Sequence, residues 1–185
     1  MPGGFKLVNT DSQGDVTGKQ KTFSVLAATA EVIVPGDLVR IAGTANAEGV
    51  ADVSIAPTTT ASTGVVMSID PTFAGEALSQ THHAASTLGT LKVNVDPNAL
   101  YEVDVANGPL AITNVGQNCP AVVTEATASG SLFPSVMTAN ATGAATTVTL
   151  PLRIVALKED ADGVLGNVAI VRLNATTVAA GATGV

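Results

Sequence analysis

Short runs rich in Val, Ile and Thr recur from residue 21 to residue 174, and Gly or Pro lies between most of them. Branched side chains suit the pleated surface of a sheet, whereas Gly and Pro favour turns. Short strands separated by frequent turns are typical of a sandwich or barrel. The pattern therefore predicts an all-β fold, either a β-barrel or a jelly-roll-like sandwich. The runs are KTFSVLA (21–27), EVIV (31–34), DLVRIA (37–42), ADVSIA (51–56), TGVVMSI (63–69), LKVNV (91–95), LYEVDV (100–105), AVVTE (121–125), SLFPSVM (131–137), TTVTLPLRIVAL (146–157) and NVAIVRLN (167–174).

The clearest alternation of apolar and polar residues lies in LKVNVDPNALYEVDV, residues 91–105. Because alternate residues of a strand share a face, its apolar side chains should all point into the core. We expect a hairpin in which Lys92 lies opposite Asp104, with the turn after the first strand. The structural residues of this hairpin are Val95, Asp96, Pro97, Asn98 and Tyr101.

The core of this protein must be built from small side chains. Ala, Val and Thr number 30, 25 and 24 of the 185 residues, and there is no Trp and only one Tyr. Charged residues make up 12% of the chain, against about 25% in an average soluble domain. A surface with so few charges indicates that other molecules cover part of it. The alternative is a monomer whose Thr and Ser hydroxyls solvate the surface.

The net charge of −7 is unevenly placed along the sequence. Residues 41–152 contain one base, Lys92, and eight acids, while bases and acids balance in the remainder. This arrangement disfavours nucleic-acid binding, which needs a basic surface. No stretch approaches the 18 apolar residues of a membrane helix, so we expect no membrane contact. Charge alone favours an acidic body that projects from an assembly while the ends attach.

The chain is expected to form one domain with two flanking segments. Residues 1–19 are polar and Gly-rich without a regular period, which predicts an extended N-terminal arm. Residues 20–174 form the single β domain, and residues 175–185 form a C-terminal tail. No Pro-, Gly- or Ser-rich linker divides the central part.

Residue types that carry catalysis are scarce, and no cofactor or metal site is predicted. Cys119 has no neighbouring base or cation, so we interpret it as an inert packed residue. His82 and His83 are adjacent in a loop-like segment, where an exposed pair is favoured over a metal site. Asp160 and Asp162 precede a Gly, but no Glu closes a calcium loop, so a solvated turn is favoured. We therefore expect a protein that is not an enzyme.

The stretch VNVDPNALYEVDV resembles a motif of tailed-phage capsid decoration, or cement, proteins. In that family an acidic-Pro-Asn turn ends one strand, and an aromatic residue followed by Glu-Val begins the next. STGVVMSIDP, GDLVRIAGTANAEGVADVSIA and LPLRIVALKEDADGVLGNVAIVRLN resemble further family segments and occur in the same order. Family members often have Phe at the place of Tyr101 and Gln at the place of Asp104.

The resemblance implies a virion protein that binds the outer capsid surface and bridges neighbouring capsid subunits. Its expected partners are the major capsid protein and further copies of itself, as a dimer or trimer. The N-terminal arm should contact a partner, and deletion of residues 2–19 should leave a folded body that no longer coats capsids. The alternatives are a head-fibre or tail component of a phage, or a soluble ligand-binding β-module. The predicted contact residues of the arm are Phe5, Lys6, Leu7, Val8 and Lys19.

Overall fold

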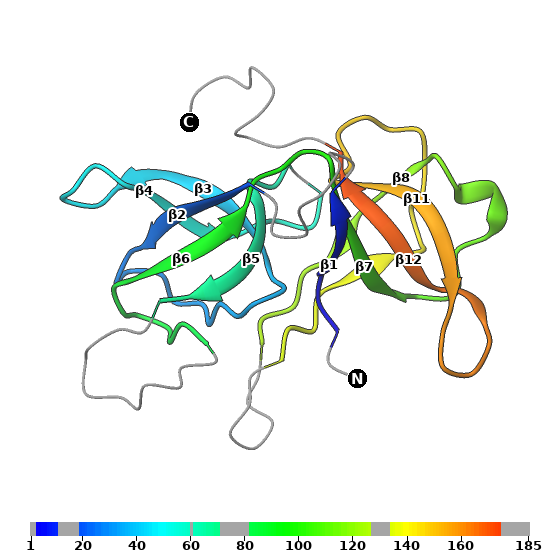
Figure 1. Cartoon of the computed structure of the whole chain (residues 1–185), viewed down its shortest axis with the longest axis horizontal. Coiled ribbons are helices and arrows are strands. Elements are labelled where there is room, and N and C mark those ends of the chain that lie inside the picture. The colour runs from blue at the N-terminus through cyan, green and yellow to red at the C-terminus, as the bar shows by residue number, and fades with distance from the viewer. Residues whose placement is uncertain (1–2, 11–18, 60, 71–81, 127–133, 175–185) are drawn as a thin grey trace.

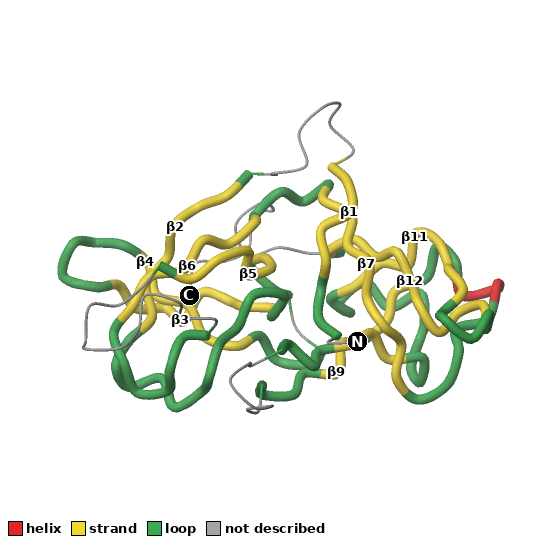
Figure 2. The backbone as a smooth tube through the Cα atoms, turned by 60° about the horizontal axis from the view of Figure 1, so that its bottom comes forward, coloured by secondary structure: helices red, strands yellow, loops and turns green. Residues whose placement is uncertain are grey.

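Strands make up nearly all the regular structure of the protein. The computed structural model describes residues 3–10, 19–59, 61–70, 82–126 and 134–174. Within them, five strands close into a barrel and seven form a sheet beside it (Figures 1 and 2). The one helical element in these ranges is a 3₁₀ turn, η1 (Ile112–Asn114), and no helix there is long and apolar enough to span a membrane. The predicted all-β fold with a barrel is confirmed.

The barrel follows the strand order β2-β4-β3-β5-β6. Only β2 and β4 pair in parallel, and the other neighbours are antiparallel. Branched side chains such as Val25, Val53 and Val93 fill the interior and are fully buried. The strands are β2 (Gln20–Val25), β3 (Leu38–Ala45), β4 (Ala51–Ile55), β5 (Gly64–Ile69) and β6 (Gly89–Asn94).

The sheet follows the order β8-β11-β12-β7-β10-β9, and β1 also pairs with β7. The strands β1 and β10 share one edge of β7, because β1 pairs with its first half and β10 with its end. On β11 and β12, every second residue of Leu152–Ile154 and Val171–Leu173 is buried. The strands are β1 (Lys6–Thr10), β7 (Ala99–Ala106), β8 (Asn118–Cys119), β9 (Ala121–Val122), β10 (Thr138–Asn140), β11 (Leu152–Glu159) and β12 (Leu165–Leu173).

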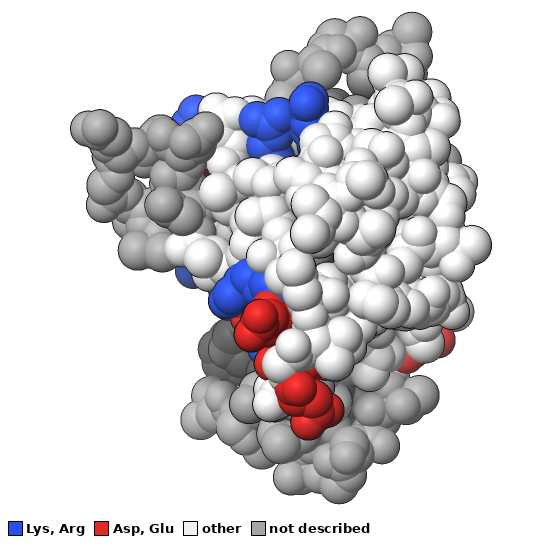
Figure 3. Space-filling view, turned by 90° about the vertical axis from the view of Figure 1, so that its right-hand side faces the viewer, with Lys and Arg blue, Asp and Glu red and all other residues white. Residues whose placement is uncertain are grey.

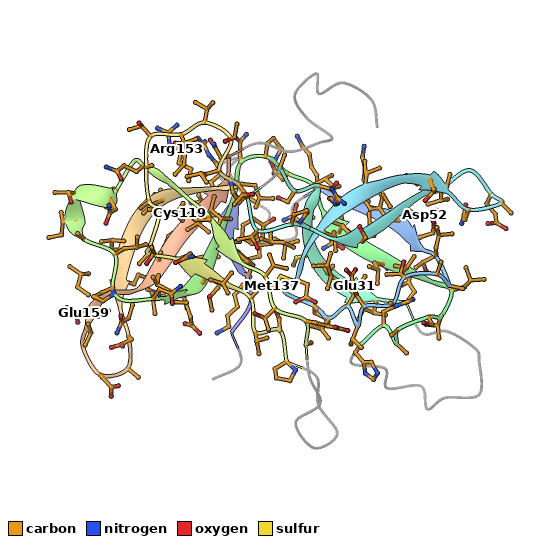
Figure 4. All side chains as sticks on the ribbon, turned by 180° about the vertical axis from the view of Figure 1, so that it is seen from behind. Glu31, Asp52, Cys119, Met137, Arg153 and Glu159 are labelled. Carbon is orange, nitrogen blue, oxygen red and sulfur yellow. The ribbon has the colours of Figure 1, made fainter. Side chains whose placement is uncertain are left out.

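Barrel and sheet share one apolar core at their junction. Leu38 and Val65 of the barrel pack in the same buried cluster as Phe5 and Tyr101 of the sheet. The Phe5 and Tyr101 rings meet edge to face, with centroids 6.3 Å apart. Met137 lies between the two parts (Figure 4), and its sulfur accepts a hydrogen bond of 3.2 Å from the Leu38 amide. The chain therefore cannot separate barrel from sheet without exposing this core.

The described part of the N-terminus is not the extended arm that the sequence predicted. Residues 6–10 form β1, which is antiparallel to β7, and Phe5 is only 3% exposed. The Phe5 amide donates to the Gly36 carbonyl oxygen at 2.9 Å. Gly4 has φ +94°, and a Cβ there would lie 2.5 Å from the Ser135 Cβ. This segment thus pairs with the edge of β7. Residues 11–18 and the predicted tail, 175–185, lie outside the described residues.

The predicted hairpin of residues 91–105 is wrong. β6 pairs with β2 and β5 inside the barrel, whereas β7 pairs with β12, β1 and β10 in the sheet. Lys92 therefore does not face Asp104, and its ammonium lies 4.0 Å from the Asp70 carboxylate instead. Both strands bury alternate residues as expected, but into different parts of the molecule, because all their edges are taken by other strands.

The segment between these strands carries the chain from the barrel to the sheet. Val95 is buried in the barrel cluster, and its amide donates to the Lys19 carbonyl oxygen at 2.9 Å. The Asp96 carboxylate accepts a hydrogen bond of 2.9 Å from the Asn98 amide, closing a turn around Pro97. The acidic-Pro-Asn sequence is therefore a turn, as predicted, but one that joins two sheets.

Most other predicted strands are present with shifted ends. EVIV (31–34) contributes only an isolated bridge between Ile33 and His83, and AVVTE is reduced to the two residues of β9. In SLFPSVM, residues 131–133 lie outside the described part, and residues 134–137 are irregular before β10. The sequence pattern missed β1, because only five residues of the polar N-terminus form it.

We expect Phe5→Ala to reduce the free energy of unfolding by about 3–5 kcal/mol, the usual range for a buried Phe. The reason is that Phe5 fills the shared core. The matched control is Val8→Ala on the same strand, since Val8 is 44% exposed, and its effect should stay below about 1 kcal/mol. Urea denaturation of both variants measures the difference. Equal small losses would contradict the buried position of Phe5.

The Tyr101 hydroxyl is a second testable feature of this core. The residue is fully buried, and its hydroxyl oxygen has no hydrogen-bond partner among the described residues. A buried hydroxyl without a partner costs about 1–3 kcal/mol. Tyr101→Phe should therefore leave the protein equally stable or up to about 2 kcal/mol more stable in urea denaturation. A loss above about 1 kcal/mol would show that the hydroxyl is bonded.

Candidate interaction surface

The five predicted contact residues of the N-terminus do not form one surface. Phe5 belongs to the core, and Leu7 is half-buried against the same cluster. Lys6 is exposed on β1 opposite Glu102, and Val8 is 44% exposed. Lys19 is exposed just before β2. Of the predicted residues, Lys6, Val8 and Lys19 are exposed to a partner. A partner cannot reach Phe5 without unfolding the core.

The acidic residues of 41–152 are spread over both parts of the molecule. Asp52 and Asp70 belong to the barrel region, whereas Glu102 and Asp104 belong to β7 of the sheet. Glu102 forms an ion pair with Lys158 of β11. The expected separation into an acidic body and near-neutral ends is therefore not a feature of the fold, since distance along the sequence does not follow position in space.

His83 and the Asp160 carboxylate each form hydrogen bonds within the fold. His83 is 1% exposed, which corrects the expected exposed pair, and burial lowers the pKa of its imidazole. Its backbone pairs with Ile33 in both directions. The Asp160 carboxylate accepts hydrogen bonds from Asn167, Val164 and Asp162, which lower its pKa within a β11–β12 turn. No group of three His, Cys, Asp or Glu in the described ranges is arranged to hold a metal ion.

Cys119 is a packed core residue, as expected. It lies on β8, is fully buried, and Figure 4 shows it within the sheet. Burial raises the pKa of its thiol to about 12, so the thiolate is absent at neutral pH.

A groove of about 530 Å³ opens at one end of the barrel. Its polar lining includes Glu48, Asp70 and Thr90, and no base lines it. The Thr90 hydroxyl donates to Asp70 at 2.9 Å, and the Ser24 hydroxyl donates to the buried Asp52. These oxygens are already bonded within the protein, and the remaining wall is apolar. The groove suits an apolar or cationic group.

The far end of the sheet exposes a group of large apolar side chains. We call Ile112, Val115, Val155, Val164 and Leu165 the distal surface; their exposed fractions run from 41% for Val155 to 73% for Ile112. Two backbone hydrogen bonds hold it together, from Leu110 to Gly166 at 3.0 Å and from Gly116 to Ile154 at 2.9 Å. In Figure 1, η1 and the β11–β12 turn lie at the end away from the barrel.

At this end of the molecule the charges belong to β11, β12 and the turn between them, whereas the segment around η1 carries none. Figure 3 faces this end, and most of the visible described surface is neither basic nor acidic. Residues 105–124, which contain η1, include no charged residue at all. Exposed apolar groups with few charges are typical of protein–protein contact surfaces. The uncharged stretch was visible in the sequence, but the exposure of its apolar residues was not.

No protein family, curated protein or solved structure matches the chain.

One titratable group at the barrel–sheet junction is strongly perturbed. Asp37 is fully buried, and its carboxylate accepts a hydrogen bond of 2.9 Å from the Val34 amide. Burial raises the pKa of Asp37 from 3.8 to about 6, although hydrogen bonds from Ser135 and Val34 oppose the shift. The folded protein thus holds this proton more tightly than the unfolded chain does, and it loses stability as the pH rises through about 6.

We expect Asp37→Asn to remove this pH dependence. The wild type should lose about 3 kcal/mol relative to the variant between pH 4 and pH 8, because about two pKa units are involved. The variant amide oxygen can still accept from Val34. Unfolding free energies at several pH values measure the difference between the two proteins, and Asp162→Asn in the exposed turn is the control. A constant difference across this range would show that the pKa of Asp37 is the same in the folded and the unfolded protein, which would contradict the shift caused by burial.

Proposed function

We propose that this protein is a structural component of a phage virion, a decoration or cement protein on the outer capsid surface. In this proposal it binds the major capsid protein, bridges neighbouring capsid subunits and acts as a homo-oligomer, a dimer or trimer. It has no catalytic role and binds neither nucleic acid nor membrane. The virion assignment is supported by the resemblance of VNVDPNALYEVDV and the segments around it to decoration proteins.

The observation that carries an assembly role is the distal surface. Its apolar side chains stand on a sheet whose strands are hydrogen-bonded to one another and tied to η1. Burial of one such side chain contributes about 1.5–3 kcal/mol. A surface of this kind binds a partner with little loss of conformational entropy, because its backbone is already ordered.

A capsid offers many identical binding positions, so the contact of a single copy does not need to be strong. An oligomer that engages two or more subunits gains affinity through effective concentration. In this arrangement the sheet contacts the shell and the barrel projects, since the distal surface lies at the end of the molecule away from the barrel (Figure 1). A head-fibre or tail component would use the same surface on another virion protein.

A second candidate function is a ligand-binding β-module, which the groove at the end of the barrel supports. The groove is large enough for a small apolar or cationic molecule. The exposed Leu88 beside it, 64% accessible, adds apolar area. This function would place the binding residues on the barrel. Substitutions in the barrel groove and in the distal surface therefore distinguish the two candidate functions.

We expect Ile112→Asp to weaken binding to capsids of the phage that carries this sequence at least tenfold. An exposed Ile tolerates the change in the free protein, but burying a carboxylate against a partner is costly. Leu88→Asp on the barrel is the matched control and should bind as the wild type does. Co-sedimentation with purified capsids measures bound copies per capsid, and urea denaturation checks that both variants fold. Loss of binding in Leu88→Asp alone would contradict the proposed surface.

A further inference from the structure

Two arginines lie directly opposite each other on the outer face of the sheet. Arg153 of β11 and Arg172 of β12 are register partners. Their neighbours Leu152 and Leu173 are buried, so both arginine side chains leave the sheet on the other face. Directly opposite residues in an antiparallel pair have Cβ atoms about 5 Å apart. The pairing of the strands thus places the Cβ atoms of the two arginines side by side on one face of the sheet.

These arginines have no acidic partner within the described part of the chain. The two ion pairs found there join Lys92 to Asp70 and Lys158 to Glu102. Neither the Arg153 nor the Arg172 guanidinium group forms a hydrogen bond or ion pair with another described residue. Like charges that face each other across strands destabilise a sheet. An anionic group between the guanidinium groups would reverse this effect.

The pair lines an open pocket of about 400 Å³ whose walls are polar and apolar in nearly equal parts. Leu100, Val115 and Val155 contribute to the wall, and the last two also belong to the distal surface. A guanidinium group can donate two parallel N–H···O hydrogen bonds to the two oxygens of a carboxylate. The pocket therefore combines two such donors with a surface for the methylene groups of an acidic side chain.

We propose that Arg153 and Arg172 form a binding site for carboxylate side chains presented by a partner protein. This inference rests on the proposed function, because it gives the chemistry of the partner that meets the distal surface. A protein is favoured over nucleic acid for two reasons. The chain has a net charge of −7, which repels a polyanion, and the site offers two bases rather than an extended basic track. The partner surface should place Asp or Glu among apolar residues.

The site can be tested on the isolated chain with glutarate as the probe. Glutarate should shift the side-chain Nε–Hε NMR signals of Arg153 and Arg172 in a saturable manner, whereas the uncharged glutaramide should not. Arg153→Gln should raise the dissociation constant at least tenfold, because a charge-assisted hydrogen bond is lost. Lys158→Gln, on the same strand but paired with Glu102, should not change it. The proposed site would be overturned if glutarate does not bind, or if it binds Arg153→Gln with the same dissociation constant as the wild type.

The identity of the partner needs further measurements. A single-stranded oligonucleotide that displaces glutarate at lower concentration would assign the site to nucleic acid and overturn the proposal. An oligomer that dissociates in Arg153→Gln, seen by light scattering, would assign the carboxylates to a second copy and overturn it as well. Capsid binding that weakens at least tenfold in the Arg153→Gln/Arg172→Gln double variant would support a protein partner.

The capsid assay also separates failure of this inference from failure of the proposed function. If Ile112→Asp loses capsid binding while the double arginine variant binds normally, the arginine site is overturned and the decoration role stands. If the wild type does not bind capsids at all, the decoration role is overturned. In that case the glutarate titration still decides whether the arginines form a carboxylate site.

Discussion

The rest of the structure depends on the shared core between barrel and sheet. Phe5 and Tyr101 meet there with Leu38 and Val65, so one apolar cluster fixes the two parts relative to each other. The loop between β3 and β4 at the end of the barrel lies at one end of the molecule, and η1 with the β11–β12 turn lies at the other (Figure 1). The proposed contact with a shell at one end, with the barrel projecting at the other, would need such a rigid connection.

The sequence predicted the local structure well and the strand pairing poorly. Alternation along residues 91–105 placed the buried residues of β6 and β7 correctly, because period 2 depends on the strand itself. Alternation could not show that the two strands bury their apolar faces in different cores. Strand pairing depends on which other strands have a free edge. The same limit applies to β1. Its five residues carry a weak pattern, and they form a strand because β7 offers a free edge beside them.

The candidate surfaces were even less accessible to sequence reasoning. Arg153 and Arg172 are far apart along the chain, and only the register of β11 and β12 places them opposite each other. The distal surface joins residues of η1 with residues of β11 and β12. A stretch without charges, residues 105–124, was a visible signal for it. The N-terminal contact residues were predicted from the resemblance to decoration proteins, and the burial of Phe5 shows that a polar, Gly-rich segment can still insert a large side chain into the core.

The central claim is that the sheet, through its distal surface, attaches this protein to a phage capsid. The most direct measurement is an electron-microscopy structure of the virion at a resolution that places side chains. The account predicts the chain on the outer shell, with Ile112 and Val155 buried against the major capsid protein and the barrel projecting outward. A virion without this chain on its shell, or one in which the distal surface faces solvent while the barrel mouth contacts the capsid, would contradict the account.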